Sequence, residues 1–144
     1  MSRKIEKDNK KYLTLFFILL AFTFNTCTEE EIFFTPGNGT YEGIFTIVES
    51  NNSTQSGKVT FTLSNNNYSS SPEKRYLPPA GGGAFQINKN KIFLEDKIIH
   101  TADFDWTLIL NGEFEFTYDG IKLILTQNDL QFNRFRKIEL IKQN

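Results

Sequence analysis

Two groups of side chains in this chain could do covalent or metal chemistry, and the first is a single thiol. Cys27 is the only cysteine. A thiol can act as a nucleophile, ligate a metal, pair in a disulfide or be modified. Cys27 directly follows a largely apolar stretch and precedes the acidic cluster Glu29, Glu30 and Glu31. Without a second cysteine, no disulfide can form within the chain, and this position favours modification of the thiol over catalysis.

The second group surrounds the only histidine. His100, Asp103 and Asp105 stand at His-x-x-Asp-x-Asp spacing. On a strand the two aspartates would share a face, where both carboxylates could approach a hard cation such as calcium. Simple alternation also explains them, because Phe104 and Trp106 would then occupy the opposite, buried face. We favour alternation, so the sequence predicts no metal site and no cofactor.

No Ser/His/Asp or Cys/His arrangement suited to nucleophilic catalysis is evident, so the sequence predicts a protein that is not an enzyme. Phosphate binding by the glycine run Gly81-Gly82-Gly83 is also disfavoured, because a strand-like segment follows it where a phosphate loop needs a helix.

The first 26 residues have the organisation of a secretory signal peptide. Several basic residues precede the apolar run Tyr12–Phe24. That run has 13 residues, whereas a membrane-spanning helix needs about 20. A solitary cysteine after such a run must pair between chains, stay free or be modified.

Residues 1–31 resemble the signal of a bacterial lipoprotein of the Bacteroides type. In that family the signal is cleaved before the cysteine, which then carries a thioether-linked diacylglycerol. The preceding residues Phe24-Asn25-Thr26 depart from the commonest form of the motif. Glu29, Glu30 and Glu31 resemble the acidic surface-export signal of outer-membrane lipoproteins. The resemblance implies a lipid anchor at Cys27 and exposure at the cell surface; the alternative is an ordinary secretory signal followed by a solvated acidic tail.

Charge argues against a nucleic-acid partner. After cleavage before Cys27 the chain would keep 11 basic and 15 acidic residues, a formal charge of −4. Nucleic-acid binding depends on neutralising phosphates with a basic surface. The small basic cluster at Arg134, Arg136 and Lys137 does not supply one.

The remaining 118 residues suffice for one domain, and their pattern predicts β-strands. Apolar residues alternate at Val59, Phe61 and Leu63. Turn dipeptides such as Asp119-Gly120 tolerate the positive φ of tight hairpins. We expect four consecutive strands from Phe104 to Ile141 and a looser set of strands from Gly39 to Glu95.

The sequence therefore predicts an all-β fold of about eight antiparallel strands in an up-and-down meander, preceded by a signal peptide. Closure into a barrel is favoured because it removes exposed sheet edges. A two-sheet sandwich is the alternative. The expected division is residues 1–26 as signal, 27–38 as lipidated cysteine and acidic tether, and 39–144 as the barrel domain.

The strand order and the segment Gly39–Gly43 resemble lipocalin-like domains of small bacterial lipoproteins. In lipocalins a Gly-x-Trp on the first strand packs against an Arg on the last. Here Tyr41 replaces the Trp, and the resemblance implies that Arg134 or Arg136 lies over its ring and closes one barrel end.

Two functions remain open for such a barrel. In the first, a small apolar or glycan ligand binds at the barrel mouth, where the loop after Tyr68 also brings Arg75 and Tyr76. In the second, aromatic side chains fill the interior, and the protein acts structurally or binds an envelope protein in an outer-membrane assembly. The expected partners are thus the membrane, through Cys27, and either a small molecule or a protein.

Overall fold

The computed structural model describes residues 34–74, 76–101, 103 and 105–144. The expected signal peptide, the lipidation site Cys27 and the acidic cluster Glu29, Glu30 and Glu31 lie outside these residues, as does Arg75. Among the residues described, no helix is long and apolar enough to cross a membrane.

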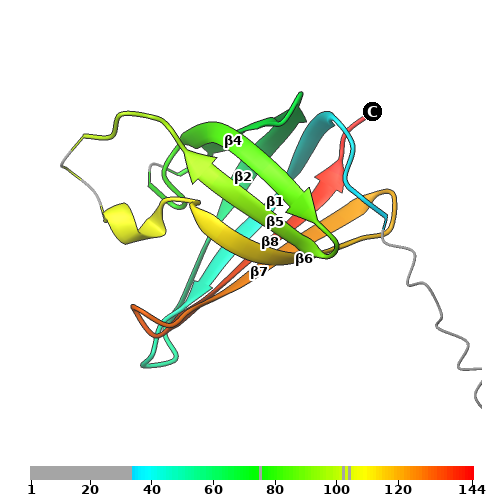
Figure 1. Ribbon diagram of the computed structural model, residues 1–144. Helices are drawn as coiled ribbons and strands as arrows, with labels where there is room; N and C mark the ends of the chain where they lie inside the picture. Colours follow the sequence, from blue (N-terminus) through cyan, green and yellow to red (C-terminus); the bar gives the residue numbers. More distant parts are fainter. Residues whose placement is uncertain (1–33, 75, 102, 104) are drawn as a thin grey trace, which may run out of the picture. The chain divides into compact units, whose positions relative to one another are not determined.

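The domain is a closed barrel of eight antiparallel strands (Figure 1). The strands are β1 (Gly39–Val48), β2 (Thr54–Ser64), β3 (Asn67–Pro72), β4 (Gly81–Asn88), β5 (Lys91–Asp96), β6 (Gly112–Tyr118), β7 (Lys122–Asp129) and β8 (Arg134–Lys142). Each strand pairs with the next along the chain, as the alternating sequence predicts.

Pairing of β1 with β8 closes the barrel and excludes the alternative two-sheet sandwich. The two strands approach closely at Gly43. A Cβ at this position would lie 1.7 Å from the Glu139 carbonyl oxygen, so only glycine fits.

Alternating side chains fill the barrel interior. The prediction for Val59, Phe61 and Leu63 is confirmed, since all three are buried. The buried hydrophobic residues are Tyr41, Phe45, Ile47, Val59, Phe61, Leu63, Tyr68, Ile92, Leu94, Leu110, Phe114, Phe116, Leu123, Leu125, Ile138 and Leu140. Trp106, which was expected on a buried face, is 52% exposed. An eight-stranded barrel is just wide enough for such side chains to occupy its interior.

The prediction that a strand starts at Phe104 is wrong. A short 3₁₀ turn, η1 (Trp106–Leu108), takes its place, and β6 begins only at Gly112. The Asp105 carboxylate starts this turn by accepting a hydrogen bond from the Thr107 amide at 2.9 Å. The C-terminal meander therefore has three strands, and Phe104 itself lies outside the described residues.

The up-and-down order gives the barrel two different ends. We call the first the loop end; its connections are residues 49–53, 73–80, 97–111 and 130–133. The opposite end we call the terminal end, because the chain enters β1 and leaves β8 there, beside the short turns at 65–66, 89–90 and 119–121. Figure 1 shows η1 and the β7–β8 turn on the side away from the C-terminus.

Candidate functional site

Residues 105–111, which we call the cap, lie across the loop end and are held from inside the barrel. Leu110 of the cap is fully buried. The Tyr68 hydroxyl donates a hydrogen bond of 2.6 Å to the Leu110 carbonyl oxygen. Arg136 Nη1 donates to the carbonyl oxygens of Ile109, at 3.0 Å, and Thr107, at 3.3 Å. Side chains from β3 and β8 thus satisfy backbone acceptors that could not otherwise be buried without cost.

Arg136 is the central residue of this arrangement. Its residue surface is only 5% exposed, and Nη2 lies 3.1 Å from Asp129 Oδ2. The guanidinium also lies 5.8 Å from the centre of the Phe114 ring. Burial lowers the pKa of Arg136 below its usual value, and the charge of Asp129 opposes that shift. A buried guanidinium needs such partners, because desolvation of an unpaired charge is costly.

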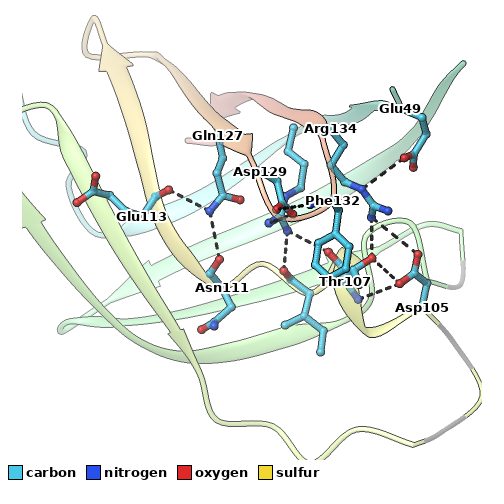
Figure 2. Close-up of polar contacts among 11 residues, drawn as sticks. Glu49, Asp105, Thr107, Asn111, Glu113, Gln127, Asp129, Phe132 and Arg134 are labelled. Atoms are coloured by element: carbon cyan, nitrogen blue, oxygen red, sulfur yellow. Dashed lines mark hydrogen bonds and ion pairs between the residues drawn. The ribbon is translucent and has the colours of Figure 1, made fainter. Parts of the chain in front are cut away.

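Arg134 fixes the outer part of the cap (Figure 2). Its Nη1 donates to Thr107 Oγ1 at 2.6 Å and lies 3.8 Å from Asp105 Oδ2. Nε contacts Glu49 of the β1–β2 turn at 3.4 Å, without hydrogen-bond geometry. The guanidinium is 5.1 Å from the centre of the Phe132 ring. One side chain therefore links the cap to both neighbouring turns.

The pKa of Asp105 reflects these contacts. Desolvation tends to raise it, but hydrogen bonds from Thr107 and the positive charge of Arg134 outweigh that effect, so the pKa is lowered. Asp105 therefore stays ionised as the acceptor that begins η1.

A second buried pair holds the start of the 97–111 connection. His100 Nε2 lies 2.5 Å from Asp96 Oδ2, and both side chains are more than nine-tenths buried. The other carboxylate oxygen accepts a hydrogen bond from the Gly82 amide at 2.7 Å. The His100 ring meets Trp106 edge to face, with 6.0 Å between ring centres. The sequence had suggested Asp103 and Asp105 as neighbours of His100, whereas the carboxylate in contact is Asp96.

A cleft of about 640 Å³ opens at the loop end, between the cap and the β7–β8 hairpin. Trp106 of the cap and Phe132 of the hairpin both line it. Four residues with amide side chains also line it: Asn111, Gln127, Asn128 and Gln131. Its volume lies in the range of small-molecule sites.

One amide of the cleft has unused hydrogen-bonding capacity. Gln127 Nε2 donates to the carbonyl oxygens of Glu113, at 3.0 Å, and Asn111, at 3.4 Å (Figure 2). Its Oε1 is buried and has no hydrogen-bond partner among the described residues. Buried acceptors in native proteins are normally paired.

The two predicted ligand-binding residues that the structure describes, Tyr68 and Tyr76, lie in different surroundings. Tyr68 belongs to the core, where it stacks on Phe61 with 5.6 Å between ring centres. Tyr76 donates a hydrogen bond of 2.6 Å to Asp103 Oδ2 and so links the 73–80 and 97–111 connections. Neither tyrosine lines the cleft, and Arg75 lies outside the described residues.

The expected packing of Tyr41 against an arginine is not formed. Tyr41 lies at the terminal end, where Lys142 Nζ is 6.0 Å from its ring centre. Arg136 is paired with Ile47, six positions further along β1. Because each strand residue advances about 3.3 Å, register places Tyr41 and Arg136 at opposite ends of the barrel.

The calcium-site geometry weighed from the sequence does not occur, because Asp103 and Asp105 do not share a strand face. Asp103 accepts hydrogen bonds from Tyr76 and Thr101, and Asp105 caps η1. Within the described part of the chain, no three His, Cys, Asp or Glu side chains gather as metal ligands.

Comparison with protein-family models, with curated proteins and with solved structures gave no match for this chain.

Proposed function

We propose that this chain is a lipid-anchored outer-membrane protein that acts at the cell surface by binding a small ligand at the loop end of its barrel. The support for the anchor is the order of residues in the sequence: a basic head, a short apolar run and then Cys27. The acidic cluster Glu29, Glu30 and Glu31 supports export to the surface.

The observation that carries the binding proposal is the position of the cleft. It opens at the loop end, whereas the chain enters the barrel at Gly39, at the terminal end. The segment that follows Cys27 would thus join the barrel at the end opposite the cleft. Residues 28–38 could reach up to about 35 Å when extended, enough to hold the barrel clear of a membrane. A surface receptor needs its binding site at the end opposite its anchor, so that the site faces away from the membrane.

Packing of the core favours a site outside the barrel interior. The interior positions are taken by buried aromatic and aliphatic side chains, with Leu110 placed across the loop end. In the cleft, Asp96 contacts His100 and Asp129 contacts Arg136. These acids and bases are engaged in holding the cap, which supports binding over catalysis.

The anchor is tested by Cys27→Ser, with Thr28→Ser as a matched control that keeps the thiol. We expect metabolically supplied palmitate to label the wild type and the control but not Cys27→Ser, and we expect the precursor of that variant to stay unprocessed. Labelled, processed Cys27→Ser protein would contradict the anchor.

Surface exposure is tested on intact cells with added protease. Replacement of Glu29, Glu30 and Glu31 by Gln should protect the barrel domain from cleavage, while the wild type is degraded. Equal degradation of both would remove the export role of the acidic cluster.

Ligand binding is tested by thermal melting of the full chain with a broad panel of small molecules: sugars, fatty acids, short peptides and aromatic acids. A saturable rise in Tm with at least one class is expected, because a ligand that binds only the folded state stabilises it. Absence of any rise across the panel would contradict the binding proposal.

A specific observation also favours the second candidate function, a filled barrel that binds an envelope protein. Ile44 and Ile141 are 40% and 44% exposed on the outer face of β1 and β8, beside a cleft of about 590 Å³ that also includes Lys58 and Glu73. A photo-crosslinker at Ile141 should then capture one envelope protein on intact cells, and a crosslinker at Trp106 should not.

A further inference from the structure

The ionisable side chains that line the loop-end cleft contact one another. Among the residues that the structure describes, four ionisable ones line it, and they form two contacts, Asp96 with His100 and Asp129 with Arg136. A charged ligand would have to break one of these contacts or leave its own charge without a partner. Either event is unfavourable in a partly desolvated site. The cleft therefore favours a ligand with no net charge.

Two aromatic rings give the cleft apolar surface on both sides. Trp106 is 52% exposed and Phe132 is 39% exposed. Trp106 meets His100 edge to face, and the guanidinium of Arg134 lies over Phe132. These contacts fix the orientation of both rings before a ligand arrives, so little side-chain entropy is lost on binding.

The amide side chains that line the cleft can both donate and accept hydrogen bonds. An amide side chain carries two N–H donors and one oxygen acceptor, and four amide residues line the cleft. A fatty acyl chain would bury these groups without satisfying them, which is unfavourable. A ligand rich in hydroxyl groups would satisfy them.

We propose that the cleft binds a neutral carbohydrate. A pyranose ring has an apolar C–H face that packs on Trp106, and its hydroxyl groups exchange hydrogen bonds with the exposed amides of Asn128 and Gln131. This inference rests on the proposed ligand-binding function and names the class of ligand. It requires no covalent step.

The only tryptophan of the chain lies in the cleft, so intrinsic fluorescence reports on this site alone. The full chain is purified in lauryldimethylamine oxide, a detergent without a sugar headgroup. Neutral probes are gluco-, manno-, galacto- and xylo-oligosaccharides; charged probes are oligogalacturonates and glucosamine oligomers. At least one neutral probe should shift the emission, reduce acrylamide quenching of Trp106 severalfold and bind at least about tenfold more tightly than both charged probes.

Variants are compared by calorimetry. Trp106→Ala should weaken binding of the neutral probe about tenfold or more, and Trp106→Phe should retain most of it, because an aromatic face is preserved. Ile121→Ala is the matched control, since Ile121 is an exposed hydrophobic residue at the terminal end. It should leave the affinity unchanged. Melting curves of each variant establish that the fold is intact.

The outcomes separate this inference from the function on which it rests. If neutral sugars fail while a fatty acid, peptide or aromatic acid stabilises the protein and shields Trp106, the carbohydrate inference is overturned and the binding function stands. Sugar binding without protection of Trp106 would also overturn it, because the site would lie elsewhere. Failure of every class would overturn both.

Discussion

The two ends of this barrel are closed in different ways. At the terminal end the Tyr41 hydroxyl donates to the Gly37 carbonyl oxygen at 2.7 Å, and its ring meets Tyr118 edge to face at 6.3 Å. At the loop end a segment of backbone, the cap, is drawn across the barrel by Arg136 and Tyr68. The first closure uses aromatic packing and short turns, and the second uses buried polar groups.

That difference has a physical consequence. Aromatic packing tolerates small shifts, whereas a buried guanidinium stabilises one arrangement only if all its partners are in place. The arrangement of the loop end therefore depends on a few specific polar contacts, although Arg136 Nε is buried without a hydrogen-bond partner among the described residues. A binding site needs such a fixed arrangement, and the cleft lies at this end.

The largest effect should follow Arg136→Leu. This variant removes the hydrogen bonds to Ile109 and Thr107 and leaves the nearly buried Asp129 without its cation. We expect a loss of about 3–5 kcal/mol in the free energy of unfolding, measured by urea denaturation. Lys137→Leu, at the adjacent and more exposed position, is the control and should cost at most about 1 kcal/mol. Equal losses would show that the cap does not depend on Arg136.

Tyr68→Phe should have the next largest effect. It deletes one oxygen and leaves the Leu110 carbonyl oxygen buried without its donor. We expect a loss of about 1–3 kcal/mol, and acrylamide should quench Trp106 more readily, because the cap is loosened. An unchanged quenching constant would contradict the role of Tyr68 in holding the cap.

Tyr41→Phe removes the equivalent hydroxyl oxygen at the terminal end. Its hydrogen bond to Gly37 is only partly buried, so we expect a smaller loss, about 0.5–1.5 kcal/mol, by urea denaturation. Quenching of Trp106 should stay at the wild-type value. A larger loss than that of Tyr68→Phe would reverse the comparison between the two ends.

The smallest effect on stability should come from Trp106→Ala. Half of this side chain is already exposed, so we expect a change within about 0.5 kcal/mol in the free energy of unfolding. A loss of several kcal/mol would instead assign Trp106 to the packing of the cap.

The strands were predictable because their signals are local. Alternation at Val59, Phe61 and Leu63 marks one buried face, and Asp119-Gly120 forms the β6–β7 turn with Gly120 at φ +101°. The alternation of Trp106 and Leu108 predicted a strand that does not form. There the Asp105 side chain accepts a hydrogen bond at the start of η1, and Arg136 and Tyr68 donate hydrogen bonds to the backbone. These contacts override the local pattern and produce a 3₁₀ turn.

The site was less predictable because its contacts depend on register and loop geometry. Arg134 and Arg136 were identified, but their partners were not, since sequence does not say that Ile47 opposes Arg136. One signal was present: Arg136, Ile138 and Leu140 alternate, which places the arginine on the buried face. No comparable signal joins Asp96 to His100, because the three residues between them form no regular element.

The most direct test of the account is hydrogen–deuterium exchange of the full chain, with and without a saturating neutral oligosaccharide that binds in the calorimetric panel. We predict slower amide exchange in peptides covering 105–111 and 127–133, and unchanged exchange in peptides covering 116–123 and 138–144. Protection at the terminal end, or equal protection at both ends, would contradict the assignment of binding to the loop end.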